Sequence, residues 1–203
     1  DRLRPHRVAM AGRVPTDGTA SLPVRQVEAL ADGVHRLAEA AARHGIAVHY
    51  HNHVGTWIET PQELELLMPR LDPALADICF DTGHFAYGGG DPASFVHEHH
   101  ERIGYLHLKD VDPAVVTEAR RQGDSFLDAL RRYVFSPIGH GSVDIPAILE
   151  TLRRSRFAGW IVVEQDTCKG DPTETARENL AAIQRWLATS APSAGRVKGE
   201  RAS

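Results

Sequence analysis

The chain has 203 residues, of which 42% are hydrophobic and 25% are charged, as is typical of a soluble globular domain with one sizeable core. Its formal net charge of −4 gives no electrostatic reason to expect nucleic acid or an anionic membrane as a partner, and no apolar run approaches the ~20 residues that span a bilayer. The two cysteines, Cys79 and Cys168, stand far apart, which argues against a disulfide framework and favours a cytoplasmic location.

The N-terminal region begins without a Met and without the apolar run of a signal peptide. A strand-like run at residues 7–11 comes almost first, so we interpret the chain as shortened at its N-terminus. A helix is predicted over 24–44, because apolar residues recur there at spacings of three and four and Gly45 follows as a C-terminal cap. The run at 46–50 predicts a buried strand.

The rest of the chain continues this alternation. Thr60-Pro61-Gln62-Glu63 combines a cap residue, a first-turn proline and an acidic first turn, which predicts a helix to about Met68. Three glycines at 88–90 are interpreted as a flexible loop rather than a phosphate cradle, because no Lys-Ser or Lys-Thr pair follows. Further elements are expected as strands at 77–80, 103–108, 134–135 and 160–163, and as helices that start at Asp91-Pro92 and span 143–155 and 173–188.

Strands that are apolar throughout and alternate with helices indicate an α/β fold with a parallel sheet covered on both faces. No G-x-G-x-x-G turn favours a dinucleotide fold, and ionisable residues gather where the strands end, as on the catalytic face of a (β/α)8 TIM barrel. A complete barrel takes ~250 residues. We therefore predict an incomplete barrel over 1–189 that lacks about the first two β/α units and has an open edge, followed by a flexible tail at 190–203.

Four strand ends carry the candidate chemistry: His49–His53, Asp81–His84, His107–Asp110 and Glu164–Asp166. A single histidine at a strand end is more often structural than a ligand, and Asp81 alone would serve as a helix cap. Recurrence at the same end of successive strands favours a metal site, and mixed imidazole and carboxylate ligands suit Mn²⁺, Co²⁺, Fe²⁺ or Zn²⁺. The remaining histidines are expected to have no such role; they are His6, His35, His44, His97, His99, His100 and His140.

These motifs resemble the xylose-isomerase-like superfamily, and within it the inosose (2-keto-myo-inositol) dehydratases. The resemblance covers about residues 7 to 187. It rests on Asp81-Thr82-Gly83-His84, on His107-Leu108-Lys109-Asp110 and on a Glu that ends the last strand. The more specific likeness to the dehydratases rests on residues 11–15, 50–56, 81–92, 107–111 and 123–128.

The resemblance implies a divalent ion, with Mn²⁺ or Co²⁺ preferred over Zn²⁺ or Fe²⁺, held by Glu, Asp, His and Glu from four strands. Asp81, His107 and Glu164 match the last three ligands. The first position falls on His51, a departure that removes one of the two carboxylates that an isomerase or epimerase uses to move a proton. The departure favours elimination of water from a cyclic keto-polyol over isomerisation.

In such a dehydratase Glu164 is the candidate base for the proton α to the ketone, and Lys109 and His84 are candidates for both catalysis and substrate binding. His53 is a candidate for substrate binding, with a metal-ligand and a structural role left open. The expected partner is a small polyol, and a homo-oligomer is compatible with the sequence. The alternatives are a sugar or hydroxy-keto-acid isomerase or epimerase, an abasic-site endonuclease, which the acidic charge disfavours, and an inactive fragment.

Overall fold

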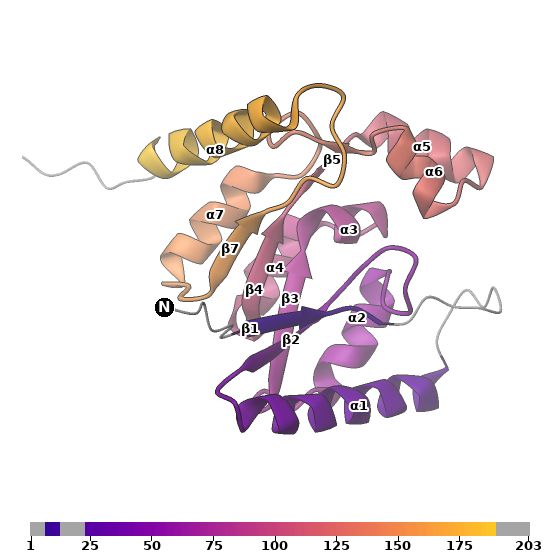
Figure 1. The fold of residues 1–203 in the computed structure, drawn as a ribbon, viewed down its shortest axis with the longest axis vertical. Coiled ribbons are helices and arrows are strands. Elements are labelled where there is room, and N and C mark those ends of the chain that lie inside the picture. Colours follow the sequence, from indigo (N-terminus) through magenta and orange to yellow (C-terminus); the bar gives the residue numbers. More distant parts are fainter. Residues whose placement is uncertain (1–6, 13–22, 190–203) are drawn as a thin grey trace, which may run out of the picture.

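The computed structural model describes residues 7–12 and 23–189, and its centre is a parallel sheet. The five strands of this sheet lie side by side in sequence order (Figure 1). All four neighbouring pairs are parallel, so every connection crosses back over the sheet, as in a β/α barrel. The strands are β1 (Arg7–Met10), β2 (Ala47–His51), β3 (Ala76–Asp81), β4 (Ile103–Leu108) and β7 (Trp160–Val163).

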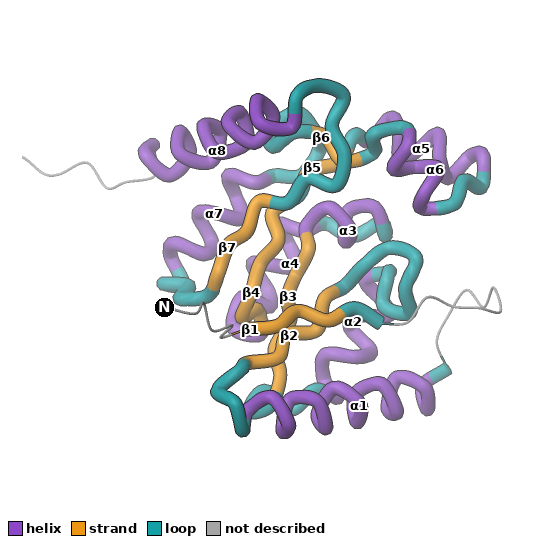
Figure 2. The backbone as a smooth tube through the Cα atoms, in the orientation of Figure 1, coloured by secondary structure: helices purple, strands orange, loops and turns teal. Residues whose placement is uncertain are grey.

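The longer crossover helices have an apolar face that packs on the core, and several, although not α1, begin at a polar side-chain cap. In α1, the buried residues Val27, Ala31, Val34 and Ala38 recur at helical spacing and face the core. Figure 2 shows how helices and strands alternate along the chain. The helices are α1 (Val24–Ala42), α2 (Pro61–Leu67), α3 (Thr82–Tyr87), α4 (Pro92–His99), α5 (Pro113–Gln122), α6 (Phe126–Arg131), α7 (Ile145–Arg154) and α8 (Pro172–Thr189), with short 3-10 turns η1 (Met68–Arg70) and η2 (His100–Arg102).

The predicted helix starts at Thr60 and Asp91 are confirmed. The Thr60 hydroxyl accepts a hydrogen bond from the Glu63 amide, and the Glu63 carboxylate accepts one from the Thr60 amide at 2.8 Å. The Asp91 carboxylate caps α4 by accepting the amides of Ala93 and Ser94. Both caps satisfy amides that the first turn of a helix leaves without partners.

The predicted incomplete barrel is confirmed, but the strand expected at 134–135 is not part of it. Phe135–Ser136 (β6) pairs antiparallel with Asp110–Val111 (β5) in a separate two-stranded sheet. The main sheet of the described residues therefore has five strands, three fewer than a closed barrel. The two-residue run is too short to cross the sheet, and the 2.9 Å hydrogen bond from the Asp112 amide to the Val134 carbonyl extends the short pairing.

The glycine run at 88–90 connects α3 to α4 rather than following a strand directly. Gly88 caps α3, and a Cβ there would collide with the Glu59 carbonyl oxygen. A Cβ on Gly90 would collide with the Phe85 ring. The absence of side chains at these positions allows the chain to pass close to the Glu59 backbone and to the Phe85 ring. The predicted tail at 190–203 and His6 lie outside the described residues.

One buried carboxylate organises the chain between β6 and α7. Asp110 is 1% exposed, and its two oxygens accept hydrogen bonds at 2.9–3.0 Å from four backbone amides. This segment thereby stays attached to the end of β4. The donors belong to Val111, Gly139, Gly141 and Val143.

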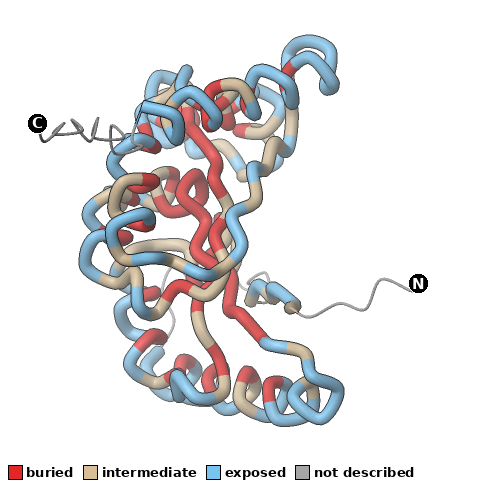
Figure 3. Tube along the Cα trace, turned by 90° about the vertical axis from the view of Figure 1, so that its left-hand side faces the viewer, coloured by how far each residue is buried: buried red, intermediate tan, exposed pale blue. Residues whose placement is uncertain are grey.

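The core lies between the sheet and the helices, whereas the flanks of the sheet are open. Figure 3 shows buried residues along the strands and on the facing sides of the helices. On the outer strand β7, Trp160 is 62% exposed and Ile161 is 38% exposed, and Val8 on β1 is 40% exposed. These two strands are the unpaired edges expected of an incomplete barrel. In the described part of the chain no helix has the length and apolar character needed to cross a membrane.

Candidate metal centre

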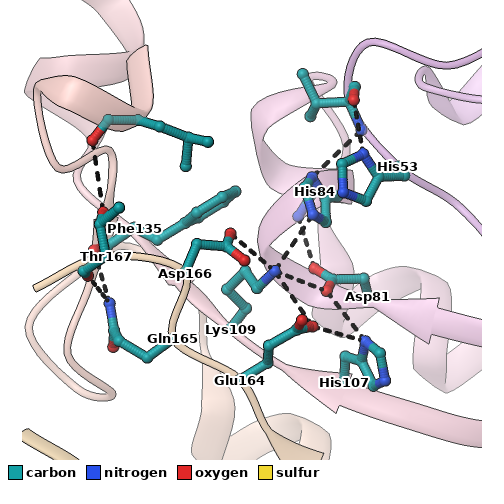
Figure 4. A network of polar contacts seen from close by, with 12 residues as sticks. His53, Asp81, His84, His107, Lys109, Phe135, Glu164, Gln165, Asp166 and Thr167 are labelled. Carbon is teal, nitrogen blue, oxygen red and sulfur yellow. Dashed lines mark hydrogen bonds and ion pairs between the residues drawn. The ribbon is translucent and has the colours of Figure 1, made fainter. Parts of the chain in front are cut away.

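The register of the sheet brings the four predicted ligands to one place. His51 and Asp81 are the last residues of β2 and β3, His107 is near the end of β4, and Glu164 directly follows β7. Asp81 lies opposite His107 in the β3–β4 pairing. The potential ligand atoms of His51, Asp81, His107 and Glu164 all lie within 4.8 Å of one another. Figure 4 shows three of these residues, Asp81, His107 and Glu164, converging from separate strands.

The ligand atoms of this cluster are buried and lack hydrogen-bond partners in the described structure. They are His51 Nδ1, Asp81 Oδ2, His107 Nδ1 and Glu164 Oε2. His107 Nδ1 lies 2.8 Å from Glu164 Oε2 and 3.6 Å from Asp81 Oδ2, without hydrogen-bond geometry. Buried polar atoms without hydrogen-bond partners are costly, even where a charged group such as Lys109 lies near. Two imidazole nitrogens and two carboxylate oxygens are a donor set that suits a divalent transition metal, so the residues fit such an ion.

The protonation of the cluster follows from its burial and charges. Burial lowers the pKa of His51 to about 4, so its imidazole is neutral and has a free lone pair at neutral pH. Burial also opposes the charged form of His107, but the neighbouring carboxylates, Asp81 foremost, outweigh it and raise its pKa to about 12. The contact with His107 lowers the pKa of Glu164 to about 2. In this state a proton on His107 supplies positive charge to the carboxylates.

Lys109 is the buried cation of the centre, at 1% exposure. Its Nζ lies 3.4 Å from Asp81 Oδ2, 3.3 Å from Glu164 Oε2 and 3.1 Å from Asp166 Oδ2 (Figure 4). Burial works against the charged amine, but the three carboxylates outweigh it and raise the pKa of Lys109. Three carboxylates beside Lys109 and a protonated His107 leave an excess of one negative charge, which becomes an excess of two once His107 loses its proton to bind a cation.

Backbone contacts fix the orientation of Asp81 and Lys109. Asp81 Oδ1 accepts the His84 amide at 2.7 Å as the cap of α3, which leaves Oδ2 free to face the cluster. The Asp81 amide and carbonyl both bond to the Asn52 side chain. The Thr82 hydroxyl donates to the Lys109 carbonyl and accepts its amide. A Cβ on Gly83 would lie 2.6 Å from Lys109 Cγ, so the absence of a side chain at Gly83 leaves space for the side chain of Lys109.

The two other candidate histidines lie together beside Lys109. The His53 and His84 rings have centroids 3.7 Å apart. His84 is fully buried, accepts the Val54 amide through Nδ1, and places Nε2 3.2 Å from Lys109 Nζ. Burial lowers the pKa of His84 well below its usual value, so it is neutral. His53 is half-buried, with Nδ1 2.7 Å from the Val54 carbonyl.

Sequence reasoning missed three residues around this centre. Asp166 binds Lys109, and its position two residues after Glu164, on the same side of an extended segment, was the available signal. The centroid of the Phe135 ring lies 4.7 Å from Lys109 Nζ, and the ring packs beside His84. Phe126, on the unpredicted helix α6, packs against His53 and His84. No spacing in the sequence connects α6 or β6 to the strand ends.

The histidines expected to have no role lie away from the centre where they are described. His97, His99 and His100 are on the surface of α4 and η2, and His44 and His140 are exposed. His35 accepts the Asp72 amide through Nε2 at 2.9 Å, a structural contact. His49, in the first strand-end motif, is buried below the centre, where its Nε2 lies 3.1 Å from Arg7.

Comparison with known proteins agrees with this architecture. Inosose dehydratase of Geobacillus kaustophilus (strain HTA426) is 38% identical over 178 residues, which are 86% of this chain and 58% of that protein. The chain thus spans little more than half of that relative's length. Two solved structures share its fold. One is L-ribulose 3-epimerase, with a TM-score of 0.69 and 15% identity over 98% of this chain and 66% of that chain. The other is IOLI protein with a binding zinc atom, with a TM-score of 0.68 and 14% identity over 91% of this chain and 64% of that chain. The family model for the xylose isomerase-like TIM barrel matches residues 2–187, and the chain belongs to that family.

Proposed function

We propose that the chain carries the metal centre of a dehydratase that removes water from a cyclic keto-polyol of the 2-keto-myo-inositol type. The observation that carries the proposal is the cluster of four buried ligand atoms without hydrogen-bond partners at the strand ends. The 38% sequence identity to an inosose dehydratase supports dehydration as the class of reaction.

His51, Asp81, His107 and Glu164 would hold the ion, with Mn²⁺ or Co²⁺ as the first expectation and Zn²⁺ or Fe²⁺ as alternatives. A divalent ion at this position supplies Lewis-acid stabilisation of negative charge on the substrate's ketone oxygen. The zinc atom bound by the structurally similar IOLI protein supports a metal ion in a protein of this fold. The excess negative charge beside Lys109 supports a divalent ion.

Glu164 is the proposed base for the proton α to the ketone. Its side chain is 38% exposed, whereas Asp81 is fully buried, so Glu164 is the carboxylate of the cluster that a substrate can reach. His107 and Lys109 hold Glu164 in its ionised form, which can accept a proton. Because His51 replaces the second carboxylate of a two-base isomerase, the centre favours one-sided proton removal followed by loss of hydroxide.

Lys109, His84 and His53 have supporting roles in this proposal. The Lys109 ammonium lies 3.3 Å from Glu164 Oε2, so its charge stabilises an oxyanion that forms beside the base. His84 Nε2 lies 3.2 Å from Lys109 Nζ, and His84 is proposed to donate to a substrate hydroxyl. His53 is the more exposed of the two histidines and is the proposed contact for a second hydroxyl.

We propose a cytoplasmic location for the protein, because Cys79 and Cys168 are both free thiols.

The test uses the 203-residue chain loaded with Mn²⁺ or Co²⁺ and incubated with 2-keto-myo-inositol. Dehydration gives a conjugated diketone with a new ultraviolet absorbance. Glu164→Gln is expected to abolish the absorbance change while circular dichroism stays native, and Glu39→Gln, at an exposed position on α1, is the matched control. A stereoisomer of the substrate in place of the diketone would assign the chain to the epimerases, and near-normal turnover by Glu164→Gln would refute the base assignment.

A further inference from the structure

A thiol lies directly beneath the proposed metal centre. Cys79 and Asp81 are two residues apart on β3, so their side chains leave the same face of the strand at successive levels. In the pairing of β2 with β3, His51 lies opposite Cys79. In the pairing of β3 with β4, Asp81 lies opposite His107. The register therefore places the His51 imidazole level with the thiol, one level deeper than the carboxylate of Asp81.

The thiol belongs to a second ligand set that shares both imidazoles with the first. The ligand atoms of His51, Cys79 and His107 all lie within 4.8 Å of one another. Cys79 is fully buried and His51 is 9% exposed. The Nδ1 atoms of His51 and His107 have no hydrogen-bond partner within the described structure, although both are buried. Two unpartnered imidazole nitrogens next to a sulfur atom are an arrangement that an ion would satisfy.

We propose that Cys79 Sγ is a ligand of the ion, together with His51 and His107, and that the centre is therefore selective for thiophilic Zn²⁺ or Co²⁺ over Mn²⁺. This inference rests on the proposed metal centre and narrows the identity of its ion. Soft thiolate ligands favour zinc, whereas an all-oxygen shell favours manganese, magnesium or calcium. On binding, the S–H proton passes to solvent and the thiolate lone pair forms the bond to the ion, with no change of oxidation state.

The two ligand sets share His51 and His107, so these two imidazoles would hold the ion in either set. Cys79 would add a sulfur ligand, with Asp81 and Glu164 as the carboxylates of the other set. The alternative role of Cys79 is that of a small apolar residue that packs in the core without a bond to the ion. The two roles differ in whether the sulfur atom of Cys79 is bonded to the ion, and spectroscopy measures this bond directly.

The primary experiment is zinc X-ray absorption on the wild-type chain and on Cys168→Ser, which removes the other thiol. The proposal expects a sulfur scatterer at about 2.3 Å in both, beside nitrogen or oxygen at about 2.0–2.1 Å. Bound zinc with only nitrogen and oxygen neighbours would overturn the inference and leave the metal centre intact. Failure of the chain to retain zinc would instead refute the centre proposed above.

Variants give a second measurement. With Co²⁺, a thiolate-to-cobalt charge-transfer band in the near ultraviolet is expected for wild type and Cys168→Ser and is expected to vanish in Cys79→Ser, while the visible d–d bands persist. Zinc affinity should fall roughly tenfold or more in Cys79→Ser, and manganese affinity should change less. Retention of the charge-transfer band in Cys79→Ser, or its absence in wild type with d–d bands present, would overturn the proposal.

Discussion

Replacing Lys109 by Met removes the buried cation but keeps most of the side chain's volume. Lys109 Nζ contacts three carboxylates at 3.1–3.4 Å. At an effective dielectric constant of about 20, a unit charge pair at about 3.3 Å interacts by about 5 kcal/mol before burial costs are subtracted. Glu164 and Asp166 are partly exposed, so solvent screens their shares, whereas Asp81 is fully buried. Leaving a buried charge without its partner costs about 3–5 kcal/mol.

We therefore expect Lys109→Met to lower the melting temperature by roughly 6–20 °C in the presence of a chelator, since a chain of this size loses about 2–4 °C for each kcal/mol. Added divalent ion should recover part of this loss, because it supplies positive charge to the same carboxylates. Differential scanning calorimetry with and without metal is the assay, and Lys169→Met, at an exposed lysine, is the control. A melting temperature of Lys109→Met within about 2 °C of that control would refute the reasoning.

Three further predictions concern the support of the centre. Asp110→Asn weakens the carboxylate that accepts four amides and should lower the free energy of unfolding by about 2 kcal/mol or more, measured by urea titration; an unchanged midpoint would contradict it. Gly83→Ala places a methyl group 2.6 Å from Lys109 Cγ and should cost about 1–3 kcal/mol, with weaker retention of the ion on dialysis; wild-type values in both would show that the lysine relocates freely. His51→Glu exchanges a nitrogen donor for a carboxylate, so competition between Zn²⁺ and Mn²⁺ should shift toward Mn²⁺ by roughly tenfold, and an unchanged ratio would argue against His51 as a ligand.

The fold was predictable where the sequence pattern extends over many residues. The long periodic helix α1 and the apolar strands β3 and β4 agree with their expected ranges to within one or two residues. Short elements were not predicted: α3 has six residues with a glycine at its second position, and α6 has six residues within a charged segment. Local patterns of this length do not distinguish a helix from a turn.

The convergence of His51, Asp81, His107 and Glu164 was predictable because parallel strands all end at one edge, so polar residues at these ends lie close together. Contacts that depend on register were not predictable. Cys79 lies opposite His51 only because of the observed pairing of β2 and β3, and a shift by one residue would turn its side chain to the other face. Phe135 reaches Lys109 through a two-stranded sheet that no sequence pattern indicated.

The carboxylate of Asp110 also determines how one segment of the chain opens. The amides of Gly139, Gly141 and Val143 all donate hydrogen bonds to this one carboxylate, so the three bonds depend on the same acceptor. When the carboxylate leaves, the three amides lose their acceptor together. These three amides should therefore exchange together, with similar protection set by Asp110, whereas the amides of Ile138 and Ser142 have other acceptors.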